Sequence, residues 1–222
     1  MWSLFILPAA LVLLAGVLHF ENTEHRVGLV AAKTSLSLLF IVTAILQPHP
    51  VPDYYHVLLF GLAFCLIGDV FLALPQKRMF LPGLVSFLIG HVCYILAFLY
   101  VAHINAFTYL GAIITFPVSA GIYLYLRPHL NSMNRPVLAY VIVISIMLCG
   151  AWSILGDSGI LLMGRISIFI AAVCFYLSDV FVARDRFVKK EYFNRVVGLP
   201  TYYVAQFLLA FSVAWIEPTA MA

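Results

Sequence analysis

The chain has 222 residues, of which 64% are hydrophobic and only 9% are charged, and its mean hydropathy is +1.08. A soluble domain needs more charge than this on its surface, so the composition excludes a soluble protein and predicts an integral membrane protein. The net charge is only +3 and the chain has no nucleic-acid-binding motif, so we expect no nucleic-acid partner.

Eight apolar stretches are long enough to cross a bilayer as helices, which takes about 20 residues each. In chain order they are Trp2–Phe20, Val27–Leu46, Tyr55–Leu74, Pro82–Val101, Phe107–Leu126, Val137–Leu155, Ile160–Ala183 and Thr201–Ile216. The short connections between them are rich in Pro, Gly, Asn and Asp, which favour turns. The predicted fold is therefore all-α, a bundle of eight transmembrane helices that forms a single transmembrane domain over residues 1–222.

The basic residues predict how this bundle lies in the membrane. Ten of the twelve Lys and Arg residues fall in the connections after the first, third, fifth and seventh predicted helices. Basic connections stay on the cytoplasmic side, so both termini are expected on the non-cytoplasmic side.

Two acids lie inside predicted spans, in similar sequences: CLIGDVFLA, centred on Asp69, and FYLSDVFVA, centred on Asp179. A carboxylate in a membrane costs several kcal/mol unless it is paired or used, which favours a functional role for both. They are 110 residues apart, and each lies near the cytoplasmic end of its helix. This duplication suggests a parallel four-plus-four pseudo-repeat, in which the two acids face each other.

Other polar side chains lie at a similar depth. His91 shares one helix face with Phe87 and Tyr94, which are one turn away on either side. Lys33 lies in the second predicted helix, and the last helix has Tyr203 and Gln206 three residues apart. We expect one polar cavity in the cytoplasmic half, and the residues predicted to line it are Lys33, Asp69, His91, Asp179, Tyr203 and Gln206.

An ordered set of motifs along the whole chain resembles the YhhN-type lysoplasmalogenase family of eight-helix membrane proteins. The set is Lys33, Gly68-Asp69, Phe87 with Gly90-His91 and Tyr94, Ser178-Asp179, and Tyr202-Tyr203-x-Ala205-Gln206. The resemblance implies hydrolysis of the vinyl ether bond of lysoplasmalogens, which releases a fatty aldehyde and glycerophosphoethanolamine or glycerophosphocholine. It also implies a bacterial inner-membrane protein whose partners are its lysophospholipid substrate and the membrane lipids.

The resemblance implies roles for the polar residues as well. The catalytic residues would be Asp69, Asp179 and His91, and the substrate-binding residues would be Lys33, Tyr94, Ser178, Tyr203 and Gln206. No metal or other cofactor is implied.

The chemistry of a vinyl ether suits two carboxyl groups. Protonation of its β-carbon creates an oxocarbenium-like cation, water attacks this cation, and the resulting hemiacetal collapses. A protonated acid and an ionised carboxylate can divide this work, as in glycoside hydrolysis, although the sequence does not tell which of Asp69 and Asp179 is the acid. His91 relays protons or holds one carboxylate in place. Lys33 keeps one aspartate ionised, binds the substrate phosphate, or only neutralises Asp69.

Two other functions are compatible with these residues. A small-solute or proton-coupled transporter also has ionisable groups in its membrane spans, but it predicts access from both faces, and here only Arg165 lies near the opposite surface. A metal-dependent lipid hydrolase could use Asp69, His91 and Asp179 as ligands, but no local ligand spacing supports it. A chelator would separate the metal-dependent hydrolase from metal-free acid–base catalysis.

Overall fold

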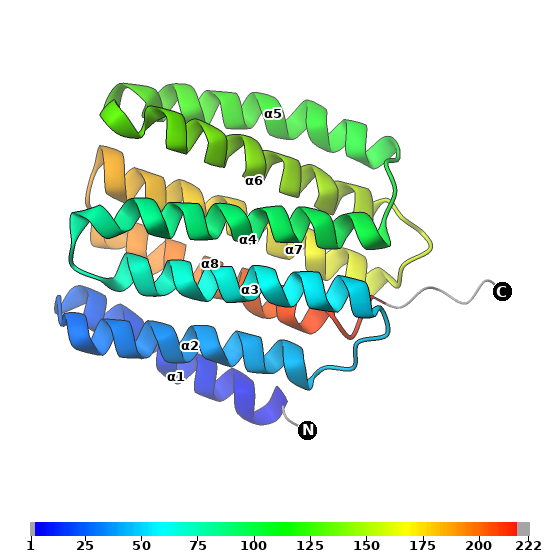
Figure 1. Cartoon of the computed structure of the whole chain (residues 1–222), viewed down its shortest axis with the longest axis horizontal. Coiled ribbons are helices and arrows are strands. Elements are labelled where there is room, and N and C mark those ends of the chain that lie inside the picture. Colours follow the sequence, from blue (N-terminus) through cyan, green and yellow to red (C-terminus); the bar gives the residue numbers. More distant parts are fainter. Residues whose placement is uncertain (1–2, 217–222) are drawn as a thin grey trace.

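The computed structural model describes residues 3–216, so Trp2 of the first predicted span lies outside the described residues. The described chain forms eight long α-helices (Figure 1). They are α1 (Ser3–Asn22), α2 (Arg26–Leu46), α3 (Pro52–Ala73), α4 (Phe80–Val101), α5 (Ala106–Leu126), α6 (Asn134–Leu155), α7 (Leu162–Ala183) and α8 (Tyr192–Ser212). A π-helical turn, η4 (Arg184–Val188), extends α7. The prediction of an all-α bundle of eight helices is confirmed.

Seven of the described helices, α1 to α7, are long and apolar enough to cross a membrane. The eighth helix, α8, begins nine residues earlier than the predicted start at Thr201. The prediction placed Pro200 before the helix, whereas the structure has it inside the helix. The Thr201 hydroxyl donates to the carbonyl of Val197 at 2.6 Å, one turn back, beside the proline. The polar residues of α8 lower its mean hydropathy. Several of them point into the protein and are buried, among them Asn194, Tyr202 and Gln206.

Six of the helices form a closed ring. Helix α3 packs against α4 and α7 packs against α8, while α2 joins α3 to α8 and α6 joins α4 to α7. Helices on opposite sides of the ring make few contacts or none in the described structure. Outside the ring, α1 covers α2 and α8, and α5 covers α6 (Figure 1). The ring therefore encloses the interior in which polar side chains can meet.

The order of helices in the ring has a regularity. The order around the ring is α2, α3, α4, α6, α7, α8, and it stays the same when the first three helices are exchanged with the last three. This exchange puts α3, which carries Asp69, in the place of α7, which carries Asp179. This is the neighbour pattern that a parallel four-plus-four repeat requires. The repeat itself, and the side of the membrane on which the termini lie, stay predictions.

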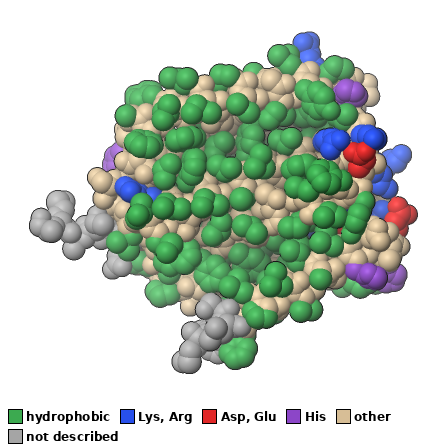
Figure 2. All heavy atoms as spheres, turned by 180° about the vertical axis from the view of Figure 1, so that it is seen from behind, with side chains coloured by type: hydrophobic (Ala, Val, Ile, Leu, Met, Phe, Trp, Pro, Cys, Tyr) green, Lys and Arg blue, Asp and Glu red, His purple; other side chains and the backbone are tan. Residues whose placement is uncertain are grey.

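One end of the bundle is strongly basic. The connections α1–α2, α3–α4, α5–α6 and α7–α8 all lie at this end, on the left in Figure 1. The ten basic residues noted above lie in these connections or in the first turn of the helix that follows. Figure 2 shows Lys and Arg side chains gathered at this end, on the right in that view, beside a surface that is otherwise largely hydrophobic. We call it the basic end.

The most extensive contact between two helices is that of α3 with α4, and two glycines allow it to be close. A Cβ atom added to Gly61 would lie 2.5 Å from Cε1 of Tyr94 and 3.1 Å from the carbonyl oxygen of Gly90. One added to Gly90 would lie 2.9 Å from Sγ of Cys65 and 3.1 Å from the carbonyl oxygen of Gly61. Small residues let helix backbones approach closely in membrane proteins, and here they fix Tyr94 in the interior of the ring.

We expect Gly61→Ala to destabilise the protein by about 1–3 kcal/mol, because the added methyl group overpacks a buried contact. Thermal unfolding in detergent measures this effect. The control is Gly121→Ala on α5, where an added Cβ has no atom within 4 Å. There, alanine should leave stability unchanged or raise it slightly, since it is a better helix former than glycine. Equal unfolding temperatures for the two variants would contradict the close α3–α4 contact.

Candidate active site

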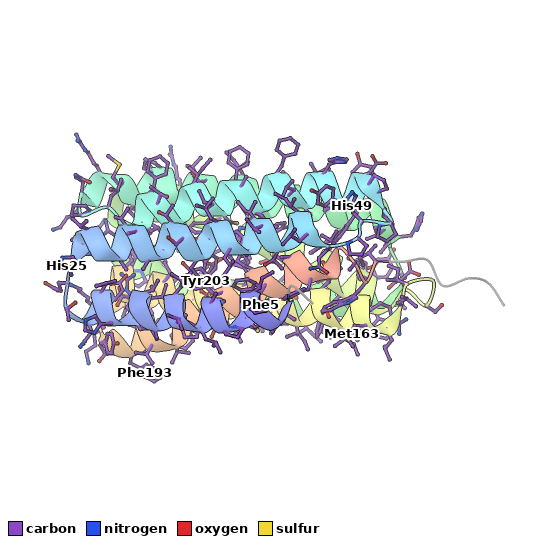
Figure 3. The ribbon with its side chains drawn as sticks, turned by 90° about the horizontal axis from the view of Figure 1, so that it is seen from below. Phe5, His25, His49, Met163, Phe193 and Tyr203 are labelled. Carbon is purple, nitrogen blue, oxygen red and sulfur yellow. The ribbon has the colours of Figure 1, made fainter. Side chains whose placement is uncertain are left out.

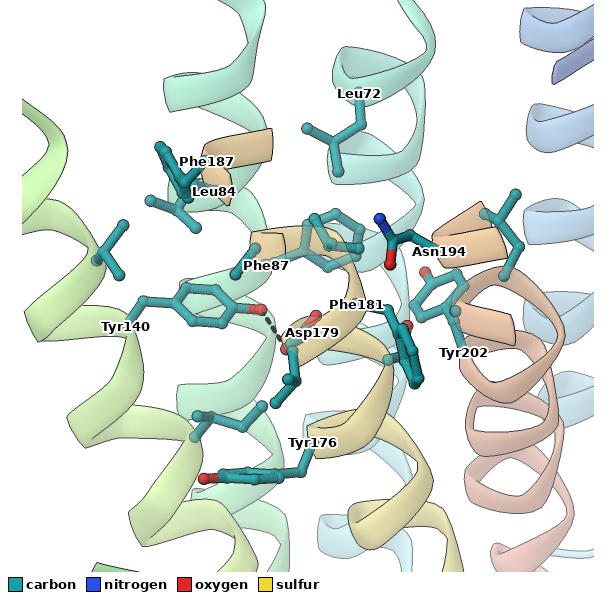
Figure 4. A pocket seen from close by; sticks show the side chains of 18 of the residues that line it. Leu72, Leu84, Phe87, Tyr140, Tyr176, Asp179, Phe181, Phe187, Asn194 and Tyr202 are labelled. Atoms are coloured by element: carbon teal, nitrogen blue, oxygen red, sulfur yellow. Dashed lines mark hydrogen bonds between the residues drawn. The ribbon is translucent and has the colours of Figure 1, made fainter. Parts of the chain in front are cut away.

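A pocket lies inside the ring, toward the basic end, and both intramembrane aspartates line it. Figure 4 shows this pocket with Asp179 labelled. Its wall is mostly apolar, with side chains from α2 to α8. Asp69 lies four residues before the end of α3, and Asp179 lies four residues before the end of α7, so both are about 6 Å from the end of their helix. The closed ring thus brings the two duplicated acids to one pocket at matching depth.

Asp69 is an ion-paired and fully hydrogen-bonded carboxylate. Oδ1 lies 3.2 Å from Nζ of Lys33, and Oδ2 accepts hydrogen bonds from Ser37 at 2.7 Å and from the Tyr202 hydroxyl at 2.6 Å. The side chains of Lys33 and Asp69 are only 3% and 2% exposed. Both oxygens of this carboxyl group are therefore engaged, one by a cationic side chain and the other by two hydroxyl donors.

A chain of hydrogen bonds continues from Asp69 across the interior. The Tyr202 hydroxyl accepts from Nε2 of Gln206 at 2.9 Å, and Oε1 of Gln206 accepts from the Tyr94 hydroxyl at 2.8 Å. Sγ of Cys65 lies 3.5 Å from the same Tyr94 hydroxyl. Gln206 therefore uses both ends of its amide, which settles its orientation and ties α8 to α4.

Asp179 has different neighbours. Its Oδ2 accepts a hydrogen bond from the Tyr140 hydroxyl at 2.7 Å, which Figure 4 shows as a dashed line, and lies 3.8 Å from Nε2 of His91. No Lys or Arg of the described chain pairs with it, and Oδ1 has no partner there. The side chain is 20% exposed, so this carboxyl group is the more open of the two.

His91 is held in one tautomer by its own helix. Its Nδ1 lies 2.7 Å from the backbone carbonyl of Phe87, which can only accept, so Nδ1 carries the hydrogen. Its Nε2 faces Asp179 and has no hydrogen-bond partner in the described structure. The rings of Phe175 and Tyr140 pack against the imidazole, with centroids 4.5 and 5.2 Å away. The neutral imidazole thus presents a proton acceptor to Asp179.

The two carboxyl groups draw their partners from corresponding helices of the ring. The partners of Asp69 come from α2 and α8, and the neighbours of Asp179 come from α6 and α4. The ring of Phe175 makes edge contacts with His91 on one side and Tyr202 on the other, at 4.5 and 5.3 Å. The site therefore has two similar halves that differ in charge and share one aromatic wall.

The residues proposed from the sequence do not all line the pocket. Its lining includes Lys33, Asp69, Ser178 and Asp179. His91, Tyr94 and Gln206 are fully buried behind that wall and reach it through the contacts described above. Tyr203 does not line this pocket but an apolar groove between α1 and α8. In the view of Figure 3, its label lies between the ribbons of α1 and α2.

Two tyrosines of the site, Tyr202 and Tyr140, were not among the residues that the sequence predicted for it. Tyr202 lies four residues before Gln206, a spacing that also puts the two on one helix face, so this signal was present. Tyr140 lies in a span without any acid, and an aromatic residue in a span is unremarkable by itself. Only the packing of α6 against α7 brings it to Asp179.

The geometry gives little support to a metal site. The described residues contain no group of three or more His, Cys, Asp and Glu side chains that could hold a metal ion. Asp69 is already paired with Lys33, so the expected set of Asp69, His91 and Asp179 does not converge on one point.

The chain was compared with known proteins. The model of the YhhN family matches residues 28–213, a range that contains every residue of the site described above. A lysoplasmalogenase of Mycobacterium bovis is 30% identical over 192 residues, which cover 82% of this chain and 68% of that protein. Lysoplasmalogenase TMEM86B of Rattus norvegicus is 31% identical over 186 residues, which cover 83% and 72%.

A more distant relative is lysoplasmalogenase TMEM86A of Bos taurus, which is 28% identical over 158 residues, covering 68% of this chain and 62% of that protein. No solved structure matches the chain. The family match extends over most of the sequence and includes both duplicated acids. This chain therefore belongs to the YhhN family.

Proposed function

We propose that this protein is a lysoplasmalogenase, which hydrolyses the vinyl ether bond of a lysoplasmalogen to a fatty aldehyde and a glycerophospho-base. One observation carries the proposal: the pocket holds two aspartates, of which Asp69 is paired with a cation and Asp179 is not. Such a difference is what the reaction needs, because one group must donate a proton while a negative charge stabilises the cation that forms. The names of the bacterial and mammalian relatives support the same activity.

Asp179 is the proton donor in this proposal. A carboxyl group with no cationic partner in a mostly apolar pocket is disfavoured as an anion. Tyr140 donates to its Oδ2, so the acidic hydrogen belongs on Oδ1, which has no partner in the described structure. The neutral acid can then deliver its proton to a substrate in the pocket.

Asp69 acts without moving a proton. Its charge is held by Lys33, Ser37 and Tyr202, and its side chain is almost fully buried. A preorganised negative charge in a low-dielectric wall stabilises a developing positive charge more strongly than it would in water. We assign to Asp69 the stabilisation of the oxocarbenium cation, and to Lys33 the positioning of Asp69.

The steps balance with one water molecule. The proton of Asp179 goes to the β-carbon of the vinyl ether, and the carbon bonded to oxygen becomes an oxocarbenium cation. Water adds to this carbon, and its proton returns to the Asp179 carboxylate, which leaves a hemiacetal. The hemiacetal collapses to the aldehyde when the bond to the glycerol oxygen breaks and the hydroxyl proton passes to that oxygen. Nε2 of His91 lies 3.8 Å from Oδ2 and has no hydrogen-bond partner in the described structure, so we assign to His91 the role of a proton acceptor beside Asp179.

We further propose that the pocket opens in the cytoplasmic half of a bacterial inner membrane. The concentration of basic residues at one end of the bundle supports this orientation through the positive-inside rule. The mycobacterial relative supports a bacterial membrane.

Asp179→Asn should lower kcat for aldehyde release from a lysoplasmalogen by at least about 100-fold, because general acid catalysis is lost. Purified protein in detergent and an aldehyde-coupled assay measure this. The variant should unfold at nearly the wild-type temperature, since no buried cation loses its partner. Wild-type activity in Asp179→Asn would overturn the assignment, and no aldehyde release by the wild type would overturn the proposed function.

Asp69→Asn should behave differently, because it leaves Lys33 buried and unpaired, which costs about 3–5 kcal/mol. The double variant Lys33→Gln with Asp69→Asn removes both charges. We expect it to regain much of the lost thermal stability and to remain poorly active, because the negative charge in the wall is absent. If the double variant recovers full activity, Asp69 has no part in stabilising the cation.

Tyr140→Phe should lower kcat about tenfold or more with little change in KM, because it removes the hydrogen bond that orients Asp179. The pH dependence of kcat should shift as well, since Tyr140 donates to a group that titrates in the reaction. A matched control is Tyr123→Phe, which removes a 2.6 Å hydrogen bond to Asn134 outside the pocket. Equal kinetic effects in the two variants would contradict a specific role for Tyr140.

A further inference from the structure

A second pocket lies at the basic end, next to the first. Its polar wall has five basic side chains and one acidic one: Arg26, Lys77, Arg186, Lys190, Arg195 and Asp185. We call this space the basic vestibule. Leu72, Phe80, Val182 and Arg195 line both pockets, so the vestibule lies directly beside the pocket of the two aspartates.

Three of the five cations have no carboxylate partner in the described structure. Arg195 pairs with Asp185 at 2.8 Å and is also bonded to Glu21, and Lys190 lies 3.4 Å from Glu24. Among the described residues, no ion pair involves Arg26, Lys77 or Arg186. The vestibule therefore carries positive charge that no carboxylate of the described chain neutralises.

Arg186 is partly ordered by neighbours that do not neutralise it. Its Nη2 donates to the backbone carbonyl of Lys77 at 3.3 Å, and its guanidinium lies over the ring of Phe80, 4.5 Å from the centroid. Phe80 also lines the aspartate pocket, so this guanidinium is held where the two spaces meet. A planar guanidinium with free N–H groups is well suited to a phosphate.

The dimensions of the proposed substrate fit the two spaces. In a lysoplasmalogen, the phosphorus is five covalent bonds from the vinyl ether oxygen, so they are about 6 Å apart in an extended chain. Asp179 lies about 6 Å from the end of α7, where η4 and Arg186 follow. With its vinyl ether beside Asp179, the substrate would have its phosphate at the mouth of the vestibule.

We propose that the basic vestibule is the subsite for the phosphodiester of the substrate, and that Arg26, Lys77 and Arg186 bind it. This inference rests on the proposed function. Binding of the substrate phosphate was one of the roles considered for Lys33 from the sequence. The pairing of Lys33 with Asp69, and its exposure of only 3%, argue against that role. The bound group is the phosphodiester of one substrate molecule and not of the surrounding anionic lipid.

The test compares two substrates in neutral detergent micelles: a lysoplasmalogen and the matching 1-alkenylglycerol, which has the same vinyl ether but no phosphate. For Arg186→Gln, and for Lys77→Gln with Arg26→Gln, kcat/KM for the lysoplasmalogen relative to the alkenylglycerol should fall about tenfold, mostly through KM. The control is Arg127→Gln with Arg135→Gln, which removes two cations at the same end but outside the vestibule. This control should leave the ratio unchanged.

An unchanged ratio in the vestibule variants, or an equal fall in the control, would overturn the proposal. So would an effect that occurs only in vesicles containing anionic lipid, which would assign these cations to the bulk membrane. A second measurement does not depend on catalysis: binding of a saturated alkyl-ether lysophospholipid, which the reaction cannot cleave. Arg186→Gln should weaken this binding about tenfold relative to the wild type. If the wild type releases no aldehyde but the variant still binds about tenfold more weakly, only the proposed reaction is refuted. Unweakened binding would refute the subsite.

Discussion

The structure depends on providing partners for one carboxyl group inside the membrane. An unpaired buried charge costs several kcal/mol, and Asp69 avoids that cost by its contacts with Lys33 and Ser37 from α2 and with Tyr202 from α8. These contacts require α2 and α8 to pack side by side next to α3, which closes the ring of six helices. Closure of the ring is also what brings α7, with Asp179, to the same pocket.

The two halves of the ring show how a duplicated element can acquire two chemical tasks. The acids have the same position near the ends of α3 and α7, and their partners come from corresponding helices. The partners of Asp69 include a lysine, whereas those of Asp179 are a tyrosine and an imidazole, which are neutral in the resting site we propose. In the mechanism we propose, similar positions therefore provide a fixed charge on one side and an exchangeable proton on the other.

Sequence reasoning predicted the parts of this arrangement that are costly to place in a membrane. Composition and span length predicted eight helices, and the expense of polar groups among lipids singled out Asp69, Asp179, Lys33 and His91. The sequence could not reveal Tyr140, because a tyrosine in a span costs little and only contacts between helices give it a partner. Nor did it predict that α8 runs through Pro200, since that depends on how the helix packs and not on proline alone.

The hydrogen bonds that begin at Asp69 all point in one direction. Tyr94 donates to Gln206, Gln206 donates to Tyr202, and Tyr202 donates to Asp69. Because an amide in the middle of such a chain does not pass protons on, this chain does not relay protons to Asp69 in the mechanism we propose. The proton transfers of that mechanism then all take place on the side of Asp179 and His91.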